Sequence, residues 1–293
     1  MTSLASLAGV TFTYPSAGRA ALCSVSLGIA AGEVVAVAGP AGAGASTLLL
    51  VATGLAPRLV GGKLEGAREI RARRCGIVFA RPWTQLTGLC STVRDEVAFG
   101  PACAGGPRAD VLAAADRAMR QLGVERLAHR DPAHLSGGEL QRVVVAAALA
   151  LEPELLALDD PAAELDPAAA DALYATLPAL AAGGMGILLA TPDVERAARV
   201  ATRAVVLEEG VVAADGRPAD VLPATDVGVL ARAAGCPAPY PLDVPALLAR
   251  IEPDSGAPAH DTSDAPPAGS GPGRSTTAPD AGAPAHDTGA TAR

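Results

Sequence analysis

A glycine-rich stretch, AGPAGAGASTLLL at residues 38–50, has the spacing of a loop that holds phosphate groups. Such loops follow the pattern Gly-x-x-x-x-Gly-Lys-Ser/Thr, because the glycines let backbone amides cradle the phosphates and the lysine pairs with them. Gly39 and Gly44 occupy the glycine positions and Ser46 the hydroxyl position, but Ala45 stands in place of the lysine. The stretch is therefore either a phosphate site without its cation or a glycine-rich turn with the same spacing.

If the stretch binds phosphate, the whole segment contributes to the site. Amides at a helix N-terminus donate hydrogen bonds to an anion, and the helix dipole favours negative charge there. Ser46 would coordinate Mg²⁺, and Thr47 would contact the inner phosphates. The candidate nucleotide-binding residues of the loop are Gly39, Pro40, Ala41, Gly42, Ala43, Gly44, Ala45, Ser46 and Thr47.

A pair of aspartates follows the apolar run LLAL at residues 155–158. At the end of a buried strand, Asp159 can hold Mg²⁺ directly or through water, and Asp160 can polarise an attacking water molecule. The pair also suits the start of a helix before the sequence PAAELDPAAADAL, because Asp and Pro are frequent there. Taken alone, the helix start explains the pair better than a metal site does.

A third motif makes the pattern specific. The sequence LSGGELQR at 135–142 resembles the signature of the ATP-binding cassette (ABC) ATPases, whose fifth residue is usually Gln, and it lies between the loop and the aspartates as that family requires. ELD at 164–166 resembles the family's D-loop, which assigns that role to Asp166. Tyr14 stands where an aromatic residue of the family stacks on adenine. The signature residues are Leu135, Ser136, Gly137, Gly138 and Glu139.

The resemblance extends over roughly residues 4–225, and segments 84–101 and 203–222 resemble the cobalt and energy-coupling-factor branch of the family. It implies ATP and Mg²⁺ as cofactors. In this family each ATP lies between the phosphate loop of one chain and the signature of another. The resemblance also implies import of a vitamin or a transition-metal ion through a separate multi-spanning membrane subunit. The chain would then be peripheral, on the cytoplasmic face of the membrane.

Four positions depart from the family pattern, and all four belong to one ATP site. Ala45 replaces the phosphate-binding lysine, and Ala80 stands where the Q-loop glutamine binds Mg²⁺ and water, unless the alignment slips five residues to Gln85. Asp160 replaces the catalytic glutamate, and Pro192 replaces the switch histidine. A charge-assisted hydrogen bond contributes about 1.5–3 kcal/mol, so losing the lysine alone weakens ATP binding by roughly 10- to 100-fold.

The signature, in contrast, differs only by Glu139 in place of Gln. We therefore predict that the chain is the degenerate half of a heterodimer and supplies Ser136, Gly137 and Gly138 to a second, intact ABC ATPase subunit. The alternatives are a soluble non-transport ABC protein, a non-catalytic regulatory or scaffold subunit, and a decaying paralogue, since a fold alone does not guarantee function.

The elements that must position these residues follow from apolar periodicity. Strands that alternate with helices indicate an α/β fold with a mostly parallel sheet, which for an ABC-type P-loop NTPase carries an antiparallel part and an inserted helical subdomain over about residues 84–151. Two strands with a turn at 15–19 are predicted within residues 4–31. The other expected strands are 33–39, 75–80, 154–159, 186–191, 204–210 and 211–215, and the expected helices are 46–55, 92–100, 108–123, 137–151 and 167–182.

Composition sets the outer limits. Of 293 residues, 50% are hydrophobic and 2% aromatic, so a large core of Ala, Val and Leu is expected; the net charge of −8 argues against a nucleic-acid partner. The start of the chain lacks a signal-peptide pattern, and the uncharged run 34–57 is interrupted by its glycine-rich middle, so we predict no membrane-spanning segment. We expect an ATP-binding domain over 1–225, a short helical extension over 226–252 and a disordered low-complexity tail over 253–293.

Overall fold

The computed structural model describes residues 2–222. The predicted helical extension over 226–252 and the predicted tail over 253–293 lie outside the described residues. Within residues 2–222 the fold has the predicted class, an α/β arrangement with a mostly parallel sheet, an antiparallel part and a helical subdomain.

The main sheet has six strands in the order β5–β6–β7–β3–β8–β9. All neighbouring pairs are parallel except β8 with β9, which run antiparallel. Because the parallel strands end at the same edge of the sheet, the residues that follow them gather there. The strands are β3 (Val34–Ala38), β5 (Cys75–Val78), β6 (Leu155–Asp159), β7 (Gly186–Ala190), β8 (Arg203–Glu208) and β9 (Val211–Gly216).

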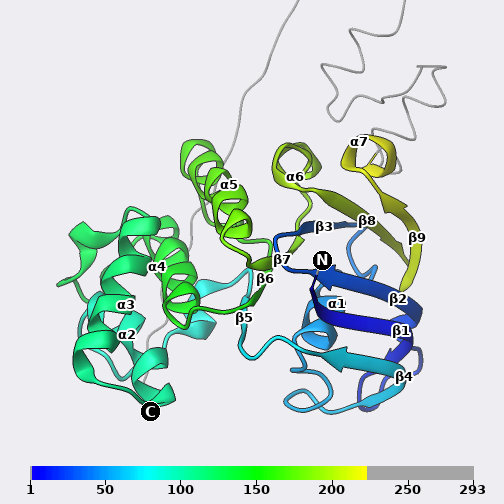
Figure 1. The fold of residues 1–293 in the computed structure, drawn as a ribbon, viewed down its shortest axis with the longest axis horizontal. Coiled ribbons are helices and arrows are strands. Elements are labelled where there is room, and N and C mark those ends of the chain that lie inside the picture. The colour runs from blue at the N-terminus through cyan, green and yellow to red at the C-terminus, as the bar shows by residue number, and fades with distance from the viewer. Residues whose placement is uncertain (1, 223–293) are drawn as a thin grey trace, which may run out of the picture. The chain divides into compact units, whose positions relative to one another are not determined.

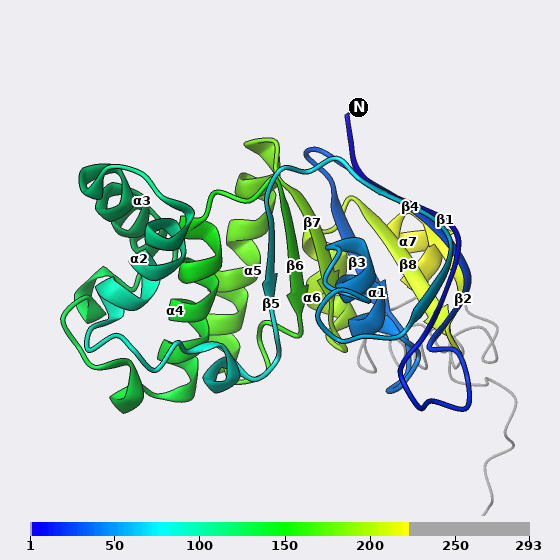
Figure 2. The same ribbon diagram turned by 90° about the horizontal axis from the view of Figure 1, so that it is seen from below.

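A second, three-stranded antiparallel sheet has the order β2–β1–β4. Its strands are β1 (Ser3–Thr13), β2 (Leu22–Ala30) and β4 (Lys63–Ile70). The first two are the strands predicted within residues 4–31, and β4 was not predicted. In Figures 1 and 2 this sheet lies at one end with α1 (Ala45–Ala52), whereas the helical subdomain lies at the other end, beyond β5.

The helical subdomain contains α2 (Val93–Ala104), α3 (Arg108–Gln121) and α4 (Gly137–Ala150), together with the short 3₁₀ helices Pro82–Gln85, Glu125–Leu127 and Pro132–His134. The remaining helices are α5 (Pro167–Ala182), α6 (Val194–Val200) and α7 (Pro218–Val221). The helix α6 was not predicted. The buried face of α3 consists of Ala114, Ala115, Ala118 and Met119, whereas Val111 is only partly buried.

Two apolar cores lie against the two faces of the main sheet. In β3, Val34 and Ala36 face the core shared with the helices α2 to α5, whereas Val35 and Val37 face the core shared with β1, β2 and α1. Side chains alternate between the faces of a strand, so a strand buried on both faces needs a continuous apolar run. The same alternation in β6, β7 and β8 explains why these segments read as unbroken runs of Val, Leu and Ala.

Candidate functional site

The glycine-rich loop connects β3 to α1, and its inner side packs closely against the backbone at Leu207 and Ala21. A Cβ atom at Gly39 would lie 2.3 Å from the carbonyl oxygen of Leu207, and one at Gly44 would lie 2.6 Å from that of Ala21. Gly44 also has a φ of 104°, a conformation that glycine adopts readily. At Gly42 a Cβ would meet nothing within 4 Å, so the outer side of the loop is open. This is the shape of a backbone cradle that admits an anion.

The start of α1 presents hydroxyl groups beside this cradle. Ser46 is exposed on the first turn, whereas Thr47 is buried. The hydroxyl of Tyr14 lies 3.2 Å from the Oγ1 atom of Thr47, and the ring of Tyr14 meets that of Phe12 edge-on at 4.9 Å between centroids. The structure therefore brings Tyr14, which follows β1, to the start of α1 beside the glycine-rich loop.

The two aspartates lie at the carboxyl edge of the sheet. Asp159 is the last residue of β6 and pairs with Ala190 of β7, and the amide of Asp160 donates to the carbonyl oxygen of Ala190 at 2.7 Å. Burial raises the pKa of Asp159, and a hydrogen bond with Ser46 partly opposes this rise. The pKa of Asp160 is raised by burial and by the charges of Asp159 and Asp193. These two carboxylates therefore form a site of concentrated negative charge next to the loop.

These residues fit Mg²⁺, but they give the phosphates no side-chain cation, which the motif normally provides. The Ser46 hydroxyl is near enough to lower the pKa of the Asp159 carboxyl, so both oxygens could serve one hard cation. Ala45, the first residue of α1, contributes a methyl group where the motif supplies an ammonium. Without that ammonium, the loop would have to hold phosphate groups through its backbone amides. Mg²⁺ held by Ser46 and Asp159 would supply the positive charge that offsets the phosphates.

The other departures from the family pattern lie at the same edge. Ala80 follows β5, whose Val78 pairs with Leu158 of β6, and Pro192 follows β7 and is exposed. The nearby Gln85 is engaged elsewhere: its Oε1 accepts from the amide of Phe79 at 2.7 Å and its Nε2 donates to the carbonyl oxygen of Ile77 at 3.1 Å. In this conformation Gln85 completes the end of β5 and does not point to a metal.

The signature residues form a regular helix start. Ser136 is the N-cap of α4, its Oγ accepts from the amide of Glu139 at 3.3 Å, and the Glu139 carboxylate accepts from the Ser136 amide at 3.1 Å. This reciprocal capping box stabilises the first turn. The pKa of Glu139 is lowered, chiefly by the hydrogen bond from the Ser136 amide and further by Arg130 at 3.2 Å. Leu135, just before the cap, is partly buried.

The glycines of the signature pack on neighbouring segments. A Cβ at Gly137 would lie 3.1 Å from the Glu164 carboxylate and 3.5 Å from the ring of Trp83, and one at Gly138 would lie 3.3 Å from the carbonyl oxygen of Glu164. Asp166, two residues further on, is the N-cap of α5 and its Oδ1 accepts from the amide of Ala169 at 3.0 Å. In Figure 1, α4 and α5 are neighbours, and α1 lies on the other side of β6 and β7.

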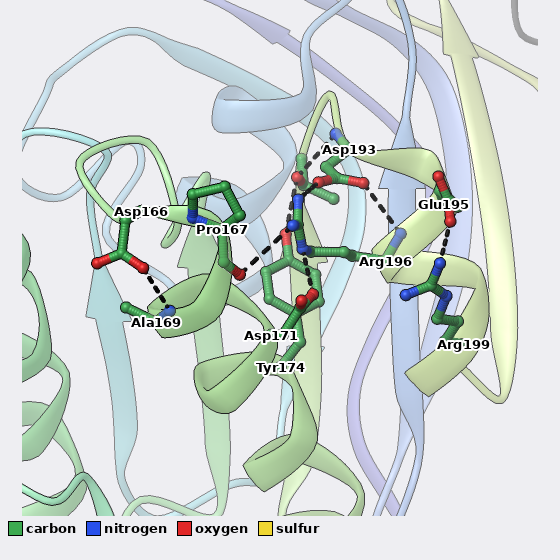
Figure 3. Close-up of polar contacts among 10 residues, drawn as sticks. Asp166, Pro167, Ala169, Asp171, Tyr174, Asp193, Glu195, Arg196 and Arg199 are labelled. Carbon is green, nitrogen blue, oxygen red and sulfur yellow. Dashed lines mark hydrogen bonds and ion pairs between the residues drawn. The ribbon is translucent and has the colours of Figure 1, made fainter. Parts of the chain in front are cut away.

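The sequence analysis missed a polar network beside Pro192 that Figure 3 shows. Arg196 of α6 contacts Asp171 of α5 at 2.7 Å and also Asp193, while the hydroxyl of Tyr174 donates to the buried Oγ1 of Thr191 at 2.9 Å. No sequence motif marks these residues, because the network joins two segments that are separated by a strand.

Comparison with known proteins identifies the family. Residues 22–163 match the ABC transporter family model. The chain is 43% identical over 223 residues to an ABC transporter ATP-binding protein of Streptomyces avermitilis, with 74% of this chain and 83% of the relative covered. The chain belongs to the ABC transporter ATP-binding proteins.

The more specific relatives of this ABC protein are of the cobalt and energy-coupling-factor type. It is 37% identical to the cobalt import ATP-binding protein CbiO of Rhodobacter capsulatus, covering 86% of this chain and 91% of the relative. It is 36% identical to the energy-coupling factor transporter ATP-binding protein EcfA of Methanothermobacter thermautotrophicus, covering 73% of this chain and 71% of the relative. Among solved structures, cbiO1 of Clostridium perfringens, part of the complex cbiONQ, matches with a TM-score of 0.66 and 26% identity, covering 80% and 95% of the two chains.

As a family, ABC ATPases bind ATP with Mg²⁺. The residues that would hold MgATP in this chain are those described above: the backbone of the loop that starts at Gly39, the Ser46 hydroxyl, the Asp159 carboxylate and the ring of Tyr14. The comparisons agree with the fold and with the family that the motifs indicated.

Proposed function

We propose that this chain is the nucleotide-binding subunit of an energy-coupling-factor-like importer for a vitamin or a transition-metal ion. Within it, the chain is the degenerate half of a heterodimer. The observation that carries the proposal is a contrast between two regions of one chain. Ala45, Ala80, Asp160 and Pro192 all lie at the edge of the sheet where ATP would bind, whereas the signature helix keeps its N-cap Ser136 exposed and both of its glycines.

The electrostatics of the chain's own site support a weak or non-hydrolysed nucleotide there. Phosphoryl transfer depends on positioning and on stabilising charge, and the loop supplies amides but no side-chain cation. Asp159 and Asp160 add negative charge beside the phosphates, and their raised pKa values reflect the cost of holding two carboxylates in a partly buried place. Mg²⁺ would offset part of this charge. Pro192 has no side-chain donor for the γ-phosphate.

A membrane subunit would be a separate chain. Among residues 2–222, none of the helices combines the length and the apolar character that a membrane crossing requires. Trp83 and Leu89 expose 50% and 78% of their surface. Between them in the sequence, Gln85 and Thr87 line a cavity of about 310 Å³ next to β5, α2 and α4. An exposed apolar segment beside a cavity is the kind of surface that receives another protein. The relative cbiO1 is itself described as part of a complex, cbiONQ.

A complementation experiment tests the heterodimer. The acceptor is this chain with Ala45→Lys, Ala80→Gln, Asp160→Glu and Pro192→His, which restore the ATP site, and with Gly137→Tyr, which blocks its own signature. Neither the acceptor alone nor the wild-type chain alone should hydrolyse ATP well. Mixing the two should give turnover, because the wild-type signature completes the restored site.

The control variants act on the wild-type chain. Gly137→Tyr should abolish complementation, since even a Cβ there meets Glu164 and Trp83, whereas Gly28→Ser should not, because a Cβ at Gly28 meets nothing within 4 Å. Robust ATP turnover by the wild-type chain alone, lost on Asp160→Asn, would overturn the proposal. If the mixed dimer forms without hydrolysing ATP, the chain is a regulatory or scaffold subunit instead.

A further inference from the structure

A single guanidinium group joins two segments of the site that the strand β7 separates in sequence. Arg196, on the first turn of α6, donates through Nε to the Asp171 carboxylate at 2.7 Å and through Nη1 to the Asp193 carboxylate. Its Nη2 also reaches the carbonyl oxygen of Pro167 at 3.5 Å. Asp171 and Pro167 belong to the first two turns of α5, and Figure 3 shows Arg196 between these residues and Asp193. In the sequence, Asp193 directly follows Pro192.

A second, buried contact joins the same two segments. The Tyr174 hydroxyl donates to Oγ1 of Thr191 at 2.9 Å, and only 2% and 6% of the surface of these two residues is exposed. Oγ1 of Thr191 also accepts from the amide of Asp193 at 3.1 Å, and Asp193 in turn caps α6 by accepting from the amide of Arg196 at 2.9 Å. The segment Thr191–Pro192–Asp193 is therefore fixed to α5 on both sides of Pro192.

The start of α5 also connects to the signature residues at the start of α4. Asp166 is the N-cap of α5, and the residues just before it pack on the first turn of α4: the carbonyl oxygen of Glu164 and the side chain of Leu165 each lie 3.3 Å from the place of a Cβ at Gly138. Close packing transmits displacements, because a packed interior does not deform continuously. A shift of α5 relative to α6 would thus change where Asp166 and the signature glycines stand.

We propose that Arg196 is a positioning residue: it ties the segment around Pro192 to the start of α5 and so holds Asp166 and the signature helix in place for the partner's ATP. This inference rests on the proposed heterodimer. A histidine at position 192 would fix that segment through the nucleotide, and Pro192 cannot. In this chain the ion-pair bridge keeps the segment in place whether or not its own site contains nucleotide.

The residue type suits this role. A planar guanidinium can donate to two carboxylates and a carbonyl group at once, which an ammonium cannot do with the same geometry. The Arg196 side chain is 25% exposed, so its ion pairs are only partly screened by solvent. On the same helix, Arg199 pairs with Glu195 in an (i, i+4) arrangement and is 62% exposed. That pair lies within α6, which makes Arg199 the matched control.

The first test measures hydrogen exchange in the full-length chain without nucleotide. In Arg196→Ala the amides of the non-proline residues within 166–171 and 191–194 should exchange faster, by about 10-fold or more. The reason is that, in the variant, these segments can open without breaking the ion pairs of Arg196. Arg199→Ala should leave these amides unchanged, and Arg196→Lys, which can pair with one carboxylate at a time, should fall between the two. Equal exchange in wild type and Arg196→Ala would overturn the inference, whatever the fate of the heterodimer.

The second test uses the complementation assay with the acceptor variant described above. Arg196→Ala in the wild-type partner should lower kcat by about 10- to 100-fold, the scale of a small misplacement of a positioned group. KM for ATP should stay unchanged, because the acceptor's own loop binds the ATP. Arg196→Lys should restore part of kcat.

The two proposals fail in different ways. If the wild-type chain itself gives no turnover with the acceptor, the heterodimer proposal fails before any Arg196 variant is compared, and the exchange experiment still decides whether Arg196 joins the two segments. If the wild-type chain gives turnover but Arg196→Ala matches Arg199→Ala in kcat, the positioning role is refuted while the heterodimer stands.

Discussion

Restoring a single cation in the phosphate loop should recover much of the affinity for ATP. Ala45 is the first residue of α1 and is only partly buried, so a longer side chain can extend from it toward the open side of the loop at Gly42. Two titratable groups at this edge of the sheet, Asp159 and Asp160, are both acidic. We therefore expect Ala45→Lys to bind the phosphates and to offset negative charge that the wild-type loop leaves uncompensated.

The size of the effect follows from one ionic hydrogen bond. A hydrogen bond to a charged group contributes about 1.5–3 kcal/mol, which corresponds to a roughly 10- to 100-fold lower Kd for MgATP. At a fixed, saturating concentration of ATP, a tenfold lower Kd adds about 1.4 kcal/mol to the free energy of unfolding. For a domain of this size that is a rise in Tm of roughly 3–6 °C.

Isothermal titration with MgATP measures the Kd, and thermal unfolding with and without ATP measures the linked change in Tm. Ala45→Gln is the control, because it adds a side chain of similar length without charge. Our reasoning is refuted if Ala45→Lys and Ala45→Gln have Kd values within twofold of each other, since the missing charge would then not limit binding.

Two further predictions concern stability and pH. Asp160→Asn should raise the free energy of unfolding at neutral pH by about 1 kcal/mol, because the pKa of Asp160 is raised by burial and by Asp159 and Asp193. Because the pKa of this carboxyl is raised in the folded state, the free energy of unfolding of the wild type falls as the pH rises through that pKa. The wild type and Asp160→Asn should therefore have the same Tm below about pH 4, where the carboxyl is protonated in both the folded and the unfolded state. A difference in Tm that stays constant with pH would contradict this prediction. Burial also raises the pKa of Tyr174 to about 12, so its neutral form is favoured in the folded state and stability should fall by up to ~1.4 kcal/mol per pH unit above about pH 10. Tyr174→Phe, which loses the hydrogen bond to Thr191, should be less stable at pH 8 but should show a smaller decline between pH 10 and 12 in alkaline denaturation.

The sequence predicted the strands and helices that have strong apolar periodicity, and it failed where burial is slight. The strand β4 is an edge strand whose side chains are largely exposed. Because it contains charged residues such as Lys63 and Glu65, its sequence shows no clear alternation of apolar and polar residues. The helix α6 has seven residues, of which only Ala197 is buried. A helix this short depends on its local cap at Asp193 and on the bridge from Arg196 to Asp171, and the bridge is a tertiary contact that local sequence does not reveal.

The candidate site was predicted unevenly for a related reason. Ser46, Asp159 and Ser136 belong to motifs with fixed spacing, so local sequence is enough to find them. The convergence of Ser46 and Asp159 at one edge follows from the parallel sheet order, whereas Ser136 begins α4 in the helical subdomain. Arg196 and Tyr174 act across elements and have no local pattern, so only the fold reveals them. The roles assigned to Ala45, Ala80, Asp160 and Pro192 stay predictions until the ATP site is assayed.

The contact between Trp83 and the signature has a practical consequence. Trp83 is the only tryptophan in the chain, and half of its surface is exposed where it lies beside Gly137. An indole ring emits at shorter wavelength when it leaves water, and the fluorescence of the three tyrosines is easily separated from it by excitation. The protein thus carries its own optical reporter at the surface that a partner's nucleotide site would cover, and docking can be followed in real time without any added label.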